Sequence, residues 1–129
     1  LAGLVGNFGQ SNYGSAKSGV AALTRITALE FAKMNVTVNA IAPVAFTRMT
    51  ENLARFQERE RAEWAPEQVC PLLLFLVSDM AAGITGKLIG AEGRHYFEYV
   101  MLRSEGLTSE EGWTPESISD KWKSIVKSD

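Results

Sequence analysis

Residues 36–43 read VTVNAIAP, a short segment in which β-branched and small apolar residues follow one another with little interruption. Such residues favour strands, and the proline at position 43 closes the segment, so we expect a strand over residues 36–42. A strand without polar alternation is typical of the centre of a parallel sheet that helices cover. Apolar residues recur at helical spacing over residues 11–33, which predicts a helix that ends a short turn before this strand. Helix, turn and strand together make half of a strand–helix–strand unit.

Further elements are expected after this strand. The apolar face of residues 47–64 predicts a second helix. A third helix is expected to begin at Pro66, a residue suited to the first helical position, and to have a kink or slow start at Pro71. Residues 87–90 predict another short strand. Before all of these, the glycine-rich residues 1–10 predict a loop.

The last part of the chain predicts a separate amphipathic helix. Thr114 and Pro115 are typical of a helix start. One face of this helix is apolar and needs a partner surface, which we expect to be the domain or another subunit. A membrane is disfavoured because the opposite face carries both acidic and basic residues. The apolar face is formed by Ile118, Trp122, Ile125 and Val126.

Composition excludes several classes of function. The chain has 129 residues and a net charge of −2, from 13 basic and 15 acidic residues, so no surface for nucleic acid is expected. The longest apolar run, residues 72–77, is too short to span a bilayer, and no export signal is readable. Cys70 is the single cysteine. We therefore expect neither an internal disulfide nor a cysteine-based metal site, and a reducing, cytoplasmic setting.

The segment QSNYGSAK at residues 10–17 places Tyr13 and Lys17 four residues apart in the predicted first helix. Residues at this spacing share a helix face, so the phenol and the amine point into one region. A nearby ammonium favours the phenolate, and a tyrosine tuned in this way can give or take a proton at an alcohol or ketone. A chance pair is the alternative. The small residues between them, Gly14, Ser15 and Ala16, leave room for a ligand or for tight packing of another backbone.

The sequence around this pair resembles that of the short-chain dehydrogenase/reductase family. The segments QSNYGSAKSGV, VTVNAIAP, TRMTENL and ITGK stand in the family's order, and the resemblance covers residues 1–93. It implies that Tyr13 is the acid/base of an oxidoreductase. It also implies that Lys17 assists the tyrosine and binds the nicotinamide ribose of NAD or NADP. Residues at the end of the strand would line the nicotinamide: Pro43, Val44 and Thr47, with Ile41 and Ala42 nearby.

The resemblance also implies a fold and an extent. The family domain is a doubly wound α/β fold with a parallel sheet, and residues 1–93 would supply its C-terminal half, with 94–129 as a C-terminal extension. The family's catalytic serine and its main phosphate-binding segment would precede Leu1. We therefore expect an N-terminally truncated chain that is inactive by itself. Exposed apolar helix faces in such a half-domain lead us to expect a homo-oligomer.

The sequence of the C-terminal extension, residues 94–129 (the tail), indicates a more specific reaction. Its segment GWTPE at residues 112–116 resembles, more loosely, the (3R)-hydroxyacyl-CoA dehydrogenase branch of multifunctional enzymes. This implies hydride transfer between a nicotinamide cofactor and a 3-hydroxy- or 3-oxoacyl thioester, or a similar alcohol or ketone. Two alternatives stay open. One is a 3-oxoacyl-carrier-protein-type reductase, and the other is a non-catalytic, oligomerising remnant that keeps the helix-packing face.

Overall fold

The computed structural model describes residues 2–53, 56 and 61–126. The chain divides into two compact units, Leu1–Tyr99 and Val100–Asp129. The division falls directly after the last strand of the sheet, because that strand pairs with its neighbour and so belongs to the first unit.

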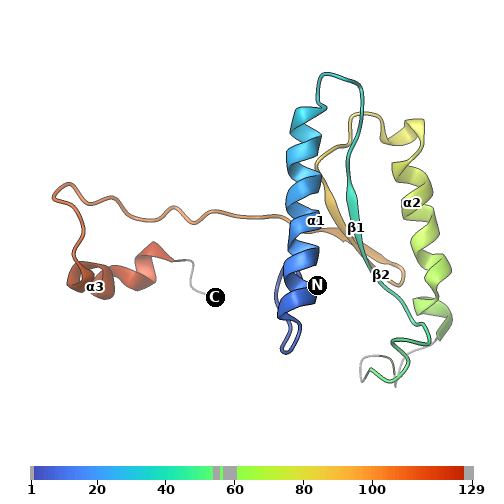
Figure 1. The fold of residues 1–129 in the computed structure, drawn as a ribbon, viewed down its shortest axis with the longest axis horizontal. Helices are drawn as coiled ribbons and strands as arrows, with labels where there is room; N and C mark the ends of the chain where they lie inside the picture. The colour runs from blue at the N-terminus through green and yellow to red at the C-terminus, as the bar shows by residue number, and fades with distance from the viewer. Residues whose placement is uncertain (1, 54–55, 57–60, 127–129) are drawn as a thin grey trace. The chain divides into compact units, whose positions relative to one another are not determined.

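Two helices flank a small sheet in the first unit (Figure 1). The strands lie in the order β1 (Ala40–Val44), β2 (Leu88–Glu92) and β3 (His95–Glu98), between α1 (Ser11–Glu30) and α2 (Cys70–Leu76). β1 and β2 are parallel, whereas β3 returns antiparallel to β2. The predicted α/β class with a parallel strand pair is therefore confirmed. The sequence pattern does not indicate β3, because this strand is short and mostly exposed.

The core lies on the α2 side of the sheet. Leu72 and Leu76 of α2 pack with Ala91 of β2, which is completely buried, and with Ile41 and Ile89 of the two parallel strands. Side chains on a strand alternate between its two faces, so the neighbouring residues of β1 and β2 face α1 instead. The sheet thus separates the face that packs on α2 from the face on which α1 lies, where Ala21, Ala28 and Leu88 are also buried.

β1 is displaced along the chain from the predicted strand over 36–42, so that prediction is wrong at both ends. It begins at Ala40 and continues through Pro43. The Ala40 N–H donates to the Lys87 carbonyl at 2.9 Å, so alternate residues of β1 bond to β2 and Pro43 faces the open edge of the strand. A proline at an edge position breaks no ladder hydrogen bond, which is why it does not end the strand.

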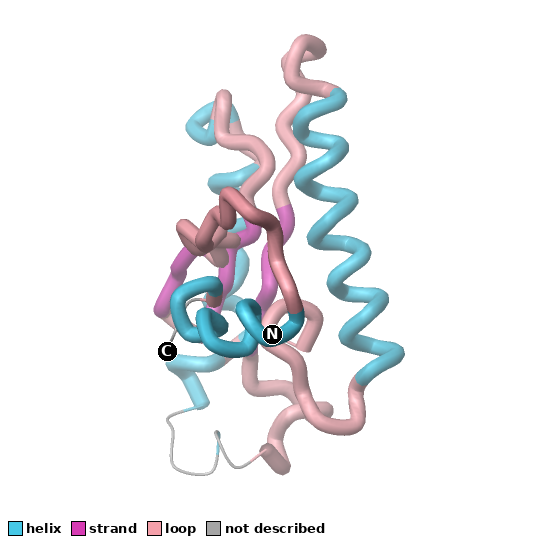
Figure 2. Tube along the Cα trace, turned by 90° about the vertical axis from the view of Figure 1, so that its left-hand side faces the viewer, coloured by secondary structure: helices cyan, strands magenta, loops and turns pink. Residues whose placement is uncertain are grey.

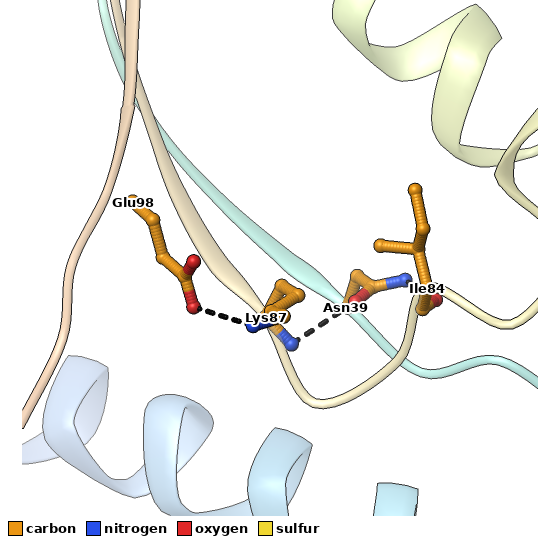
Figure 3. Close-up of polar contacts among 4 residues, drawn as sticks. All are labelled: Asn39, Ile84, Lys87 and Glu98. Carbon is orange, nitrogen blue, oxygen red and sulfur yellow. Dashed lines mark hydrogen bonds and ion pairs between the residues drawn. The ribbon is translucent and has the colours of Figure 1, made fainter.

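The Asn39 side chain explains why the strand begins late (Figure 3). Its amide nitrogen donates to the Ile84 carbonyl at 2.7 Å, and its Oδ1 accepts from the Lys87 N–H at 3.0 Å. These bonds take the place of ladder bonds just before β1. At the same point, Lys87, directly before β2, forms an ion pair at 3.0 Å with Glu98, the last residue of β3.

The first and third predicted helices are present with altered ends. α1 begins at Ser11 as predicted but ends at Glu30 rather than Lys33. A turn follows α1, with Asn35 at a φ of 56°, and the chain then returns along β1 (Figure 2). The third helix has the slow start expected from its prolines, because the 3-10 turn η3 (Pro66–Val69) precedes α2.

The second predicted helix, 47–64, is wrong over its first part, where residues 48–52 form turns. The Thr50 hydroxyl donates to the Ala45 carbonyl at 2.8 Å, and such side-chain bonds to backbone compete with a helix. The end of this segment is the 3-10 turn η2 (Arg61–Trp64). Residues 54–55 and 57–60 lie outside the described residues.

The second unit contains α3 (Pro115–Ile125), which begins where the sequence predicts. The Ser117 N–H donates to the Thr114 hydroxyl at 3.2 Å, and the Thr114 N–H donates to the Ser117 hydroxyl at 3.0 Å. This reciprocal capping box satisfies two backbone donors at the helix start. Trp122, on the predicted apolar face, is 55% exposed. Ile118 on the same face is exposed as well, whereas Ile125 and Val126 are half-buried.

Candidate functional site

A cavity of about 260 Å³ lies against α1, the N-terminal loop and the strands of the first unit. Among the described residues that line it, Tyr13 and Lys17 carry the only side chains able to give or take a proton. The other walls are apolar or backbone. They come from the loop residues Ala2, Gly3 and Leu4, from Val20 and Ala21 of α1, and from Ala40, Ile41, Ala42, Pro43 and Leu88 of the strands.

The structure brings the predicted pair together on one wall. The Lys17 ammonium nitrogen lies 5.5 Å from the centre of the Tyr13 ring, within the range of a cation–π contact. Tyr13 is 53% exposed, so a ligand in the cavity can reach its side chain. The Tyr13 N–H donates to Asn12 Oδ1 at 2.7 Å, which helps to hold the start of α1. The spacing of four residues on a helix is sufficient to produce this geometry.

Of the small residues between the pair, Gly14 serves packing, whereas Ser15 and Ala16 are exposed. Gly14 is buried, and a Cβ built on it would lie 3.0 Å from the Ala2 carbonyl oxygen. A backbone from the N-terminal loop therefore occupies the space that a side chain would fill. Neither Gly14 nor Ser15 nor Ala16 lines the cavity. The alternative of tight packing is favoured over the one in which these residues leave room for a ligand.

The predicted nicotinamide-lining residues divide into two groups. Pro43 lines the cavity with its predecessors in β1. Val44 and Thr47 do not line the cavity, because hydrogen bonds to other residues hold the chain away from it after Pro43. The Val44 carbonyl accepts from the Gly93 N–H at 3.4 Å, and the Thr47 N–H donates to the Thr50 hydroxyl at 2.8 Å.

Sequence reasoning missed the contribution of the N-terminal loop. Ala2, Gly3 and Leu4 form a wall of the cavity, although the glycine spacing indicates only a loop. The signal that could have located them is the run of small residues in the first half of α1, which predicts that another backbone approaches there.

No group of three His, Cys, Asp or Glu that could hold a metal ion occurs in the part of the chain that the structure describes. Over the same residues, the helices are all too short or too polar to cross a membrane. What the cavity offers is one phenol and one ammonium against largely apolar walls. That set can transfer a proton at an oxygen atom and can donate hydrogen bonds to hydroxyl groups.

Comparisons with known proteins agree with this chemistry. Residues 1–93 match a family model described as enoyl-(acyl carrier protein) reductase. The peroxisomal hydratase-dehydrogenase-epimerase of Saccharomyces cerevisiae is 37% identical over 128 residues, which are 97% of this chain and 14% of that protein. The 3-oxoacyl-[acyl-carrier-protein] reductase of Thermotoga maritima is 40% identical over 102 residues, 72% of this chain and 41% of that protein. The crystal structure of a short chain dehydrogenase from Mycobacterium avium matches with a TM-score of 0.78 and 38% identity. That match covers 96% of this chain and 41% of the solved one.

The chain therefore belongs to the short-chain dehydrogenase/reductase family. It spans less than half the length of each of these relatives. The yeast relative matches almost the whole chain, tail included, whereas the Thermotoga reductase matches 72% of it. This difference agrees with the resemblance of the tail to the multifunctional enzymes.

Proposed function

We propose that residues 1–93 of this chain supply the C-terminal half of the dehydrogenase domain of an NAD(P)-dependent oxidoreductase. The enzyme would act on a 3-hydroxy- or 3-oxoacyl thioester, or on a similar alcohol or ketone. The observation that carries the proposal is that Tyr13 and Lys17 lie side by side in the wall of a cavity that Pro43 also lines. Family membership supports the reaction class. The relative that matches the tail as well as the domain is a hydratase-dehydrogenase-epimerase, which supports a dehydrogenase reaction.

The cavity fits the nicotinamide–ribose end of a dinucleotide. Ligand pockets of this kind have apolar walls and few polar groups, and here Val20 and Ala42 offer apolar surface for a flat ring. The Lys17 ammonium has three N–H donors that suit ribose hydroxyls. The bound cofactor would supply or accept the hydride. We assign the pyrophosphate to residues N-terminal to this chain, because strand–turn–helix units at the start of such folds bind it.

Tyr13 would move the proton at the substrate oxygen. In the direction of reduction its phenol donates a proton to the carbonyl oxygen, and in the direction of oxidation its phenolate accepts the proton of the alcohol. Lys17 would stabilise the negative charge on the tyrosine oxygen through its own positive charge.

A second candidate function has one observation in its favour. Val20, Leu23 and Ile26 on α1 are at least half exposed, which suits a helix face that meets another subunit. A non-catalytic, oligomerising remnant would need only this face. The catalytic proposal also accommodates it, because we expect a homo-oligomer in either case. Nucleotide binding separates the two candidates.

A third candidate, a 3-oxoacyl-carrier-protein-type reductase, differs from the first only in substrate. The partial match of the Thermotoga reductase disfavours it, because that match omits more than a quarter of this chain. The cytoplasmic setting stays a prediction, and the yeast relative carries the word peroxisomal in its name.

The experiment that tests the proposal is Tyr13→Phe in the full-length enzyme, with Tyr96→Phe as the matched control. Tyr96 lies outside the cavity walls, and its hydroxyl donates to the Gln68 carbonyl. General acid–base catalysis contributes about 10²–10⁴-fold, so kcat should fall by at least about 100-fold in Tyr13→Phe. Nucleotide affinity should be retained, and Tyr96→Phe should turn over normally. Wild-type turnover in Tyr13→Phe would refute the acid/base role. An enzyme that binds no nucleotide would favour the remnant.

A further inference from the structure

The N-terminal loop touches α1 at Lys17 through a position that tolerates no side chain. A Cβ built on Gly3 would lie 2.7 Å from the Lys17 Cβ and 2.7 Å from the Ser18 backbone nitrogen. Real Cβ atoms do not approach other atoms this closely, and neither neighbour is the end of a flexible side chain that could rotate away. The absence of a side chain at Gly3 is therefore what allows the loop backbone to lie against the stem of Lys17.

Two further contacts hold the loop at the same place. The Ser18 hydroxyl donates to the Gly3 carbonyl, which ties the loop to the helix directly beyond Lys17. One turn earlier, Gly14 admits the Ala2 carbonyl, as described above. The loop is thus fixed on both sides of Lys17 along α1. The same loop residues form a wall of the cavity into which Lys17 is placed.

We propose that Gly3 and Ser18 are positioning residues that hold the Lys17 side chain at the cavity, beside the Tyr13 ring. A free lysine side chain samples many rotamers, and backbone packed against its Cβ removes those that would point elsewhere. A functional side chain is positioned well when neighbouring groups lock its rotamer, and the loop–helix contact does this for Lys17. This inference rests on the proposed function of Tyr13 and Lys17.

The test compares Ser18→Ala with Ser18→Thr and with Ser15→Ala. Ser15 lies on the same helix and outside the cavity walls, so it controls for the loss of a hydroxyl. In the 129-residue chain, nuclear magnetic resonance follows the ε-methylene of Lys17, whose resonance the Tyr13 ring displaces. In the full-length enzyme, nucleotide fluorescence gives the affinity for NADH and NADPH. Ser18→Ala should move the resonance toward that of free lysine and weaken nucleotide binding several-fold. Ser18→Thr and Ser15→Ala should change neither quantity.

Two glycine variants test the contact between the N-terminal loop and Lys17 in a second way. Gly3→Ala should displace the Lys17 resonance at least as far as Ser18→Ala does, whereas Gly19→Ala should leave it unchanged. A Cβ at Gly19 would meet nothing within 4 Å, so this variant controls for the added methyl group. If Gly3→Ala fails to fold, the serine variants decide the matter.

The outcomes separate this inference from the function on which it rests. A Lys17 resonance that stays at its wild-type value in Ser18→Ala overturns the positioning role, whatever the nucleotide affinity. A resonance that moves as expected, in an enzyme whose wild type binds nucleotide but whose Ser18→Ala variant binds it less well, supports both proposals. A displaced resonance in an enzyme that binds no nucleotide supports the contact and refutes the proposed function.

Discussion

Replacing Gly93 by alanine should weaken the contact between the turn that contains Gly93 and η2, which lies in the segment after β1. Gly93 lies in the turn between β2 and β3, with a φ of 57°. A Cβ on it would lie 2.5 Å from the Glu63 carbonyl oxygen and 3.3 Å from the Trp64 ring. The Trp64 carbonyl in turn accepts from the Phe46 N–H at 2.6 Å. Phe56, only 4% exposed, packs its ring edge-on with those of Phe46 and Trp64.

The expected cost of Gly93→Ala has two parts. Alanine in the left-handed region costs about 1–2 kcal/mol, because its Cβ approaches the following carbonyl oxygen. Relieving the overlap with the Glu63 backbone costs about 1–3 kcal/mol more, in line with other overpacked sites. Gly83 supplies the matched control, because its φ is 83° and a Cβ there would meet nothing within 4 Å. Gly83→Ala should therefore show the first cost alone.

Urea denaturation of the wild-type chain and the two variants, followed by circular dichroism, gives the free energies of unfolding. Gly93→Ala should lower this free energy by about 2–5 kcal/mol in total, and by about 1–3 kcal/mol more than Gly83→Ala does. Equal destabilisation by the two substitutions would refute the reasoning. It would show that the contact between Gly93 and η2 contributes nothing to stability.

Four further perturbations have distinct expected results. Asn39→Ala should lower the free energy of unfolding by about 1–3 kcal/mol, because two partly buried backbone groups lose their partner. Glu98→Gln should lower the free energy of unfolding by less than about 1 kcal/mol, because its ion pair is exposed. Equal destabilisation by Asn39→Ala and Glu98→Gln in urea denaturation would contradict this difference. Thr114→Ala removes the capping acceptor of α3 and should cost about 1 kcal/mol of helix stability, seen as a weaker helical signal in circular dichroism. An unchanged signal would show that the cap is dispensable. The pKa of Glu116 is lowered by hydrogen bonds from its own backbone N–H and from Thr114. The ionised Glu116 carboxylate therefore stabilises α3 above the pKa that Glu116 has in the unfolded chain. This stabilisation is lost as the pH falls through the lower pKa of the folded chain. The α3 resonances should lose helical character as the pH falls into the acid range below the usual pKa of glutamate, and a Glu116→Gln chain with the same titration step would exclude this cause.

Local features of this protein could be predicted from its sequence. The pairing of Tyr13 with Lys17 follows from the period of a helix and needs no knowledge of the rest of the chain. The start of α3 follows in the same way from a threonine that caps the helix and the proline after it. In both cases the groups that interact lie within four residues of one another.

Features that depend on distant residues could not be predicted. The start of β1 is set by Asn39, whose partner Ile84 is 45 positions away. Val44 and Thr47 leave the cavity wall because of bonds made after the strand, and one of these bonds comes from Gly93 in another turn. The wall formed by residues 2–4 depends on a close approach of two backbones, which a pattern of small residues suggests without naming the partner.

The most direct test of the central claim is a titration of the full-length enzyme with NADH and NADPH, in the wild type and in Lys17→Met. Lys33→Met is the matched control, because Lys33 follows α1 and lies outside the cavity walls. A hydrogen bond from a charged donor is worth about 1.5–3 kcal/mol, so Lys17→Met should weaken binding by about 10- to 100-fold. Lys33→Met should bind like the wild type. Equal affinities in all three proteins would contradict the claim that this cavity holds the nicotinamide ribose.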